Sequence, residues 1–213
     1  MADAAITGAK RKSILANAMN VFAKEGFGNT DVQVIADLAG VGKGTVYRYF
    51  GNKQQLFLAT AKYCLEQLGE FVQQQVGSIE AIPERVEQVG VAEILRGIAV
   101  ACAEFYERHP QAIEIMIQER AEFRDSVFPS HLMYRAETRS QLDQMLCDAV
   151  NQGTARKVDA VQAANAFGDL LYGSLVNGCL EGSKGLLVER VTQATDILLH
   201  GLLANDEAID NRQ

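Results

Sequence analysis

The stretch 41-VGKGTVYRYFGNKQQL-56 is the most informative part of the chain, because it joins a glycine-rich turn to a short amphipathic segment. Gly42 permits a tight turn. Val46 and Phe50 are four residues apart, so they share one helix face and can dock on neighbouring helices. The outward face then carries hydroxyl, amino and guanidinium groups, from Lys43, Thr45, Tyr47, Arg48 and Tyr49. Such groups bond to phosphates and base edges, so the stretch predicts a helix over 43–50 that enters a DNA groove.

Two further helices are predicted before this stretch, over about 10–25 and 30–39, after a loose arm at 1–8. Gly26 stands between them, where a helix C-terminal glycine is expected. Thr30-Asp31-Val32-Gln33 predicts a capping box in which the Thr30 hydroxyl bonds the Gln33 amide and the Gln33 side chain reaches back. Two helices, a short glycine turn and a third helix are typical of a helix-turn-helix head.

The rest of the chain is expected to be long helices, since only 3 prolines interrupt 213 residues. Apolar periodicity and breakers place them at about 53–75, 83–108, 110–124, 129–151, 159–181 and 187–204. The predicted fold is all-α with about nine helices. A DNA-binding head is expected at 1–55 and a ligand-binding and dimerisation body at 56–213.

Charge is distributed unevenly between these two parts. The whole chain has a formal net charge of −7. Residues 1–55 hold seven basic and four acidic residues, a net +3, which leaves −10 for the remainder. A basic head on an acidic body suits a protein whose head alone contacts phosphate.

Several other classes of protein are disfavoured by the sequence. The four cysteines lie far apart, so they form no redox or zinc pattern, and each is expected to be a small buried residue. No signal peptide and no apolar run of the ~18 residues needed to span a membrane is present, so a cytoplasmic protein is expected. His109, His131 and His200 have no metal-ligand spacing.

An enzyme is also disfavoured. Residues 40–45 superficially resemble a phosphate-binding loop, but Asp37 stands where the first glycine is required. Gly44 follows Lys43 where that motif needs serine or threonine. No catalytic residues, cofactor or metal are therefore expected.

The spacing of the head resembles the DNA-binding domain of the TetR family. The matching positions are Ala18, Phe22, Gly26-Phe27, Thr30-Asp31-Val32, Ile35-Ala36, Ala39-Gly40-Val41, Gly44-Thr45-Val46-Tyr47-Arg48-Tyr49-Phe50, Lys53 and Leu56. The resemblance implies a homodimer that binds a palindromic double-stranded operator, acts as a repressor and is released by a small ligand. An activator of the same fold and a helical interaction protein without DNA function remain alternatives.

The resemblance also implies roles for individual residues. Thr45 and Tyr47 match positions that face DNA, and Tyr49 and Lys53 match positions that hold phosphate. Arg11, in the arm, is expected along or in the minor groove. The chain departs from the family at Gly42, where serine is common, and at Gln33, where a charged residue is common. The predicted DNA-binding set is Arg11, Thr30, Gln33, Lys43, Thr45, Tyr47, Arg48, Tyr49 and Lys53.

The body is expected to pair two chains and to sense a ligand. The last two predicted helices carry apolar faces that suit either an intramolecular core or a four-helix dimer interface, at Leu171, Leu175, Gly178, Val191, Thr195, Leu198 and Leu202. The middle helices hold aromatic and sulfur-bearing side chains that suit an apolar or aromatic ligand. The candidates are Phe105, Tyr106, Met116, Phe123, His131, Tyr134, Phe167 and Tyr172, together with the nearby Phe128.

Overall fold

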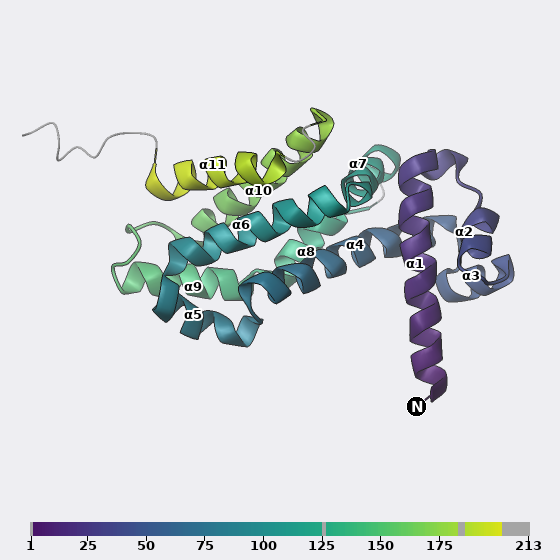
Figure 1. Ribbon diagram of the computed structural model, residues 1–213, viewed down its shortest axis with the longest axis horizontal. Coiled ribbons are helices and arrows are strands. Elements are labelled where there is room, and N and C mark those ends of the chain that lie inside the picture. The colour runs from purple at the N-terminus through teal and green to yellow at the C-terminus, as the bar shows by residue number, and fades with distance from the viewer. Residues whose placement is uncertain (1, 125–126, 183–185, 202–213) are drawn as a thin grey trace, which may run out of the picture. The chain divides into compact units, whose positions relative to one another are not determined.

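The computed structural model describes residues 2–124, 127–182 and 186–201 (Figure 1). These residues form helices and no strand, which confirms the all-α class. Eleven α-helices are present in the described part, where about nine helices were predicted. They are α1 (Ala2–Asn29), α2 (Val32–Leu38), α3 (Lys43–Phe50), α4 (Lys53–Val76), α5 (Ile82–Val89), α6 (Val91–Arg108), α7 (Gln111–Phe123), α8 (Ser130–Thr138), α9 (Ser140–Asn151), α10 (Ala160–Leu180) and α11 (Leu187–His200), with a 3₁₀ turn at Ile79–Ala81.

The extra helices come from two breaks that the sequence analysis missed. The predicted helix over 83–108 is divided at Gly90, whose φ of +83° ends α5. The predicted helix over 129–151 is divided at Arg139, which separates α8 from α9 without any glycine or proline. The last helix ends at His200. Residues 202–204 of its predicted range lie outside the described residues.

The chain divides into two compact units. The first contains Met1–Glu70 and Arg108–Thr138, and the second contains Phe71–Glu107 and Arg139–Gln213. The first unit therefore includes α7 and α8 as well as the three helices of the predicted head. The functional boundary between residues 55 and 56 stays a prediction.

Helix α1 is longer at its start than the sequence predicted. It begins at Ala2, so the loose arm expected at 1–8 is wrong. Near its other end Gly26 has φ +78° and ψ 157°, a conformation that glycine adopts without a side-chain clash. The chain kinks there, as expected from a glycine at the end of a helix.

Four phenylalanine rings pack together in the first unit. Phe57 from α4 lies 5.0 Å from Phe22 and 5.4 Å from Phe27, both edge to face. Phe123 from α7 lies 4.9 Å from Phe27 and 5.5 Å from Phe57. Edge-to-face pairs at these separations add attraction beyond the burial of apolar area. The cluster thus joins α1, α4 and α7.

A polar contact reinforces the packing of α7 on α1. The side-chain amide of Gln118 donates from Nε2 to the carbonyl oxygen of Phe22 at 3.0 Å. This carbonyl lies in the last turn before the kink at Gly26. Helix α7 is therefore tied to the end of α1 by both ring packing and a hydrogen bond.

The second unit contains α10 packed against α9 and α11. Arg96 of α6 bonds Asp196 of α11 through Nε at 2.6 Å. The Glu107 carboxylate accepts a hydrogen bond of 2.9 Å from the backbone amide of Leu187, at the first turn of α11. A carboxylate at a helix N-terminus is favoured by the unpaired amides and the helix dipole.

The variant Gly178→Ala is expected to lower the free energy of unfolding by about 1–3 kcal/mol, because the added methyl overpacks the contact between α10 and α11. A Cβ at Gly178 would lie 2.4 Å from Cδ2 of Leu187, which is itself buried. The matched control is Gly173→Ala in the same helix, where a Cβ meets nothing within 4 Å. Alanine at position 173 should raise the free energy of unfolding by about 0.5–1 kcal/mol, because alanine has a higher helix propensity than glycine. Urea unfolding checks both, and equal changes would contradict the packing.

The cysteines are all free. Cys64 and Cys102 are buried as predicted, and burial raises the pKa of each thiol to about 12. Cys147 is exposed, so the prediction of burial is wrong for that residue. No helix of the described part combines the length and the apolar composition that a membrane crossing requires.

Candidate nucleic-acid interface

The turn between α2 and α3 is built on glycine. Gly40 has φ +65°, and the next amide, of Val41, bonds back to the carbonyl of Ala36 at 3.0 Å. Gly42 is the extended N-cap of α3 and provides no side-chain cap. Val46 and Phe50 are 0% and 7% exposed, so the predicted docking pair and the helix over 43–50 are confirmed.

The start of α2 differs from the predicted capping box. Asp31 is the N-cap, and its Oδ1 accepts a hydrogen bond of 2.9 Å from the amide of Gln33. Thr30 is buried, and its hydroxyl donates to the carbonyl of Gly26 at 2.7 Å. The side chain of Gln33 donates from Nε2 to Oδ1 of Asp37 at 2.7 Å, so it points along the helix and not back to the cap. Both Thr and Asp are good N-caps, and the tertiary position of Thr30 decided between them.

The outward side of α3 presents polar groups to solvent. Tyr47 is 38% exposed, Arg48 is exposed, and Thr45 and Tyr49 are half-buried. The Arg48 guanidinium lies 5.8 Å from the centre of the Tyr49 ring, close enough for a cation–π contact. A helix with two glycines near its start and hydroxyls and a guanidinium on its free side can approach a groove closely.

Lys43 at the start of α3 is paired with the cap of α2. Its Nζ lies 2.8 Å from Oδ1 of Asp31. This hydrogen bond lowers the pKa of Asp31 and raises the pKa of Lys43. Asp31 thus caps α2 and also orients the Lys43 ammonium. Asp31 was not among the predicted site residues, although its position before α2 indicated a cap.

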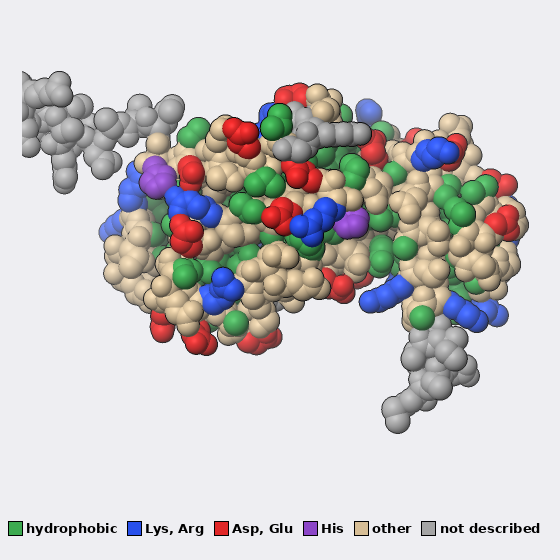
Figure 2. All heavy atoms as spheres, viewed as in Figure 1, with side chains coloured by type: hydrophobic (Ala, Val, Ile, Leu, Met, Phe, Trp, Pro, Cys, Tyr) green, Lys and Arg blue, Asp and Glu red, His purple; other side chains and the backbone are tan. Residues whose placement is uncertain are grey.

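Two other cations of the predicted DNA-binding set contact residues elsewhere in the first unit. Lys53 donates from Nζ to the carbonyl of Gly28 at 2.9 Å and lies 5.0 Å from the centre of the Phe27 ring. Arg11 lies within α1 rather than in an arm, and its guanidinium is 5.4 Å from the centre of the Phe50 ring. Figure 2 shows Lys and Arg side chains, in blue, at the lower edge of the region labelled α1 to α3 in Figure 1.

A cap at the start of α4 was missed in the sequence. The Asn52 side-chain oxygen accepts a hydrogen bond of 2.8 Å from the amide of Gln55. Asn before a helix is a recognisable signal. The cap fixes the end of the α3–α4 turn, next to Lys53.

The eight predicted ligand residues are divided between the two units. Met116, Phe123, His131 and Tyr134 lie in the first unit, and Phe105, Tyr106, Phe167 and Tyr172 lie in the second. Phe123 belongs to the phenylalanine cluster, while Phe128 is 61% exposed. Burial, and then the nearby Arg135, lower the pKa of His131.

Within the second unit, Phe105 and Tyr106 are buried with their ring centres 5.3 Å apart. Phe167 is also buried, and Tyr172 is 39% exposed. The burial of these side chains is compatible with ordinary core packing, and their role in ligand binding stays a prediction.

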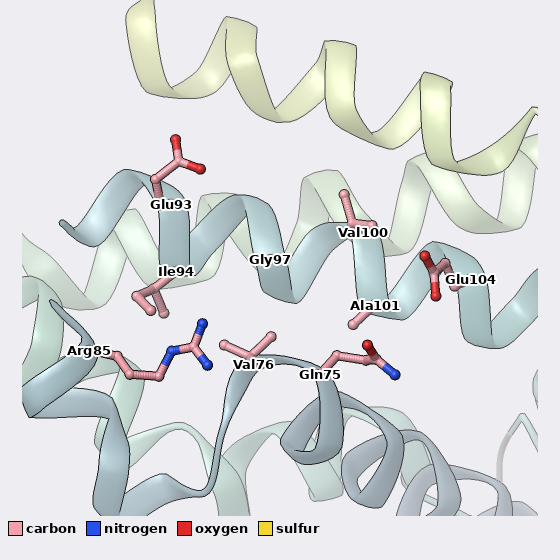
Figure 3. A pocket seen from close by; sticks show the side chains of 9 residues that line it. All are labelled: Gln75, Val76, Arg85, Glu93, Ile94, Gly97, Val100, Ala101 and Glu104. Carbon is pink, nitrogen blue, oxygen red and sulfur yellow. The ribbon is translucent and has the colours of Figure 1, made fainter. Parts of the chain in front are cut away.

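A cavity of about 210 Å³ lies elsewhere in the second unit, between the end of α4, α5 and α6 (Figure 3). Its walls include Val76 and Ile94, and Arg85 extends from α5 toward α6. None of the eight predicted ligand residues lines it. In the described part of the chain, no three His, Cys, Asp or Glu side chains are grouped to hold a metal ion.

Most of the predicted dimer residues are buried inside a single chain. Val191 and Thr195 are 0% exposed, and Leu171, Leu175 and Gly178 are also buried. This burial agrees with the alternative of an intramolecular core, and a role of these residues in a dimer interface stays a prediction. Leu198 is half-buried, and Leu202 lies outside the described residues. The exposed apolar side chains of these two helices are instead Val161, Tyr172, Leu180 and Ile197, with Leu186 just before α11.

Comparison with known proteins places the head in a family. Residues 14–60 match the family model of the bacterial regulatory proteins of the tetR family. The chain is 29% identical over 109 residues to the HTH-type transcriptional repressor NicS of Pseudomonas putida, covering 51% of this chain and 47% of that protein. It is 40% identical over 58 residues to the regulator RutR of Escherichia coli, covering 27% of each. The chain thus spans half or less of the length of these curated relatives.

The fold is shared over nearly the whole chain with solved regulators. The transcriptional regulator FadR from Bacillus subtilis, solved in complex with stearoyl-CoA, superposes with a TM-score of 0.71 at 21% identity. The match covers 90% of this chain and 99% of that one. The family match lies on the α1–α4 region whose turn, caps and docking pair are described above. Residues 14–60 therefore form a DNA-binding domain of the tetR family of bacterial regulatory proteins.

Proposed function

We propose that this protein is a homodimeric transcriptional repressor that binds a palindromic DNA operator through α3 and is released by a small ligand. The observation that carries the proposal is the free side of α3, where Thr45, Tyr47 and Arg48 stand on a helix whose other side is anchored by Val46 and Phe50. The similarity to the repressor NicS over half of the chain supports repression and not activation.

The electrostatic distribution supports DNA as the partner. Residues 1–55 have a net charge of +3, while the remainder has −10. A duplex attracts the basic end and repels the acidic body, so the charges orient the protein as well as attract it. Phosphate contacts from Lys43 and Lys53 would position α3, and Thr45 and Tyr47 would contact base edges.

A second copy of the chain is the proposed partner of α10 and α11. Val161 and Tyr172 are 46% and 39% exposed and lie about three turns apart on α10, on one face of that helix. Ile197 of α11 is 56% exposed. Two helices from each chain would form a four-helix interface with two-fold symmetry. Two heads about 34–36 Å apart would then reach successive major grooves of a palindromic site.

A small apolar or aromatic molecule is the proposed effector. The support is the complex of the similar B. subtilis regulator FadR with stearoyl-CoA, together with the aromatic candidates of the middle helices. The effector would favour a state with low DNA affinity, which requires a preference of a few kcal/mol between states. A compound that releases the DNA should bind Tyr106→Ala or Phe167→Ala more weakly than it binds the unmodified protein. Equal affinities would place the effector elsewhere.

The test of DNA binding is a gel shift with the full chain and the DNA that flanks its own gene. A specific complex should form, survive excess random DNA and weaken as salt rises, because counterions are released from phosphates. If no shift appears, selection from a random DNA pool with ligand-stripped protein follows. Failure there would contradict the proposal and favour a helical interaction protein.

Lys43→Ala is expected to weaken DNA binding uniformly across sequences and to reduce the slope of log K against log salt by about 1, because one phosphate contact is lost. The matched control is Lys24→Ala. Lys24 also lies in the first unit next to a carboxylate, 3.4 Å from Glu25, but it is 82% exposed and lies at the far end of α1 from Arg11. Gel shifts across a salt series check both variants. If Lys24→Ala reduced the slope of log K against log salt as much as Lys43→Ala does, the effect would not be specific to Lys43. Lys43 would then not belong to the interface.

A further inference from the structure

The cavity in the second unit has an arginine at one end and apolar walls along its middle, and its lining also includes Gln75, Glu93 and Glu104. Val76 from the last turn of α4 and Ile94 and Ala101 from α6 supply apolar walls. Gly97 faces the cavity without a side chain, and a Cβ there would already be 3.4 Å from Cγ2 of Val76. The absence of a side chain on this turn of α6 keeps the space open.

Arg85 supplies the positive end, and the fold holds its stem in place. The Cδ of Arg85 lies 3.1 Å from the position that a Cβ would take on Gly77. Gly77 has φ +103°, so glycine is favoured there both by the backbone conformation and by the arginine stem. In Figure 3 the guanidinium extends from α5 toward the part of α6 that holds Ile94.

The guanidinium of Arg85 has neither an ion pair nor a hydrogen bond with the residues that the structure describes, whereas Arg96 nearby bonds two carboxylates, those of Glu93 and Asp196. Glu93, at the same end of the cavity, pairs with Arg96. Glu104 lies about 15 Å further along α6 from Ile94, at 1.5 Å per residue. The two carboxylates of the lining therefore stand at opposite ends of the part of α6 that borders the cavity.

We infer that this cavity binds a small aliphatic carboxylate, with the carboxylate on Arg85 and the hydrocarbon chain between α4 and α6. The guanidinium fork matches a carboxylate in two parallel hydrogen bonds, which are stronger where water is partly excluded. A volume of about 210 Å³ accommodates about seven groups of the size of a water molecule, at ~30 Å³ each. This corresponds to a chain of about six carbons. The site is separate from the eight aromatic and polar ligand candidates, and it does not depend on DNA binding.

The test is calorimetric titration of the full chain with sodium hexanoate, hexanamide and inorganic phosphate. Hexanoate should saturate one site per chain. Hexanamide has the same chain without the charge and should bind at least about tenfold more weakly, because the charge-assisted pair is lost. Phosphate has the charge without the chain and should also bind more weakly. Absence of saturable hexanoate binding, or equal binding of all three, would overturn the inference.

Variants locate the site. Arg85→Gln should weaken hexanoate binding by about tenfold or more, and Arg85→Lys should recover part of it, since lysine keeps the charge and loses the fork. The matched control is Arg156→Gln, an exposed arginine of the same unit that does not line the cavity. Gly97→Leu should block the hydrocarbon end while Arg85 is intact. Hexanoate binding that is unchanged in Arg85→Gln, or lost equally in Arg156→Gln, would exclude this cavity.

Discussion

Phe57→Ala is expected to lose about 3–5 kcal/mol of unfolding free energy, the cost of removing a large buried ring and leaving a cavity. Phe57 is 0% exposed and lies between Phe22 and Phe27 of α1 and Phe123 of α7. Three ring pairs lose their partner together. Surrounding helices collapse only partly into such a space, so the lost packing adds to the lost transfer energy.

Phe128→Ala is the matched control for that variant. It removes the same ring, in the same unit, from a side chain that is 61% exposed, so its effect should stay within about 0.5 kcal/mol. Urea unfolding at one fixed protein concentration measures both, because the apparent stability of a protein that dimerises depends on its concentration. Similar losses for the two variants would show that the phenylalanine cluster does not stabilise the first unit.

The phenylalanine cluster has a functional consequence as well. The same contact carries the hydrogen bond from Gln118 of α7 to the Phe22 carbonyl. Any shift of α7 therefore reaches the last turn of α1, which packs with α2 and the rest of the head. In the proposed repressor, a ligand that shifted α7 would therefore have a physical route to α2 and α3.

The head could be predicted closely from sequence because its signals are local. Gly26 and the spacing of Val46 and Phe50 depend on backbone sterics and helix periodicity within a few residues. The cap of α2 shows where this reasoning ends. Thr30 and Asp31 are both good caps, and only the burial of Thr30 against α1 selects Asp31. Asp31 then pairs with Lys43, twelve residues away, which no local rule predicts.

The body could be predicted as helices but not as a packed arrangement. Helix periodicity places Leu175 and Val191 on apolar faces, and it does not say whether such a face meets the same chain or another. In the structure both are buried within one chain, and the exposed apolar residues of α10 and α11 lie at other positions. Arg85 was missed because an arginine in an amphipathic helix resembles an ordinary solvated charge. Its role depends on Gly77 and Gly97, which are distant in sequence from any motif.

Ile197→Glu is expected to convert the proposed dimer to monomers and to weaken operator binding by about 100-fold or more, because the second head would no longer bind at high effective concentration. The side chain is 56% exposed on α11, so the substitution should barely change folding of one chain while it places a charge in the proposed interface. Val89→Glu, at 48% exposure on α5, is the matched control and should remain dimeric with full DNA affinity.

Sedimentation of each variant, followed by gel shifts on palindromic and single half-site DNA, separates the possible outcomes. In the expected result, Ile197→Glu sediments as a monomer, loses its preference for the palindrome and retains weak half-site binding, because its head is intact. The proposed interface is wrong if this variant stays dimeric, since a buried, unpaired carboxylate at the centre of a helical interface is strongly destabilising. If Val89→Glu also dissociates, added charge rather than the α10–α11 face controls assembly. A monomeric variant with undiminished palindrome affinity would separate dimerisation from DNA binding and leave α3 alone to account for operator recognition.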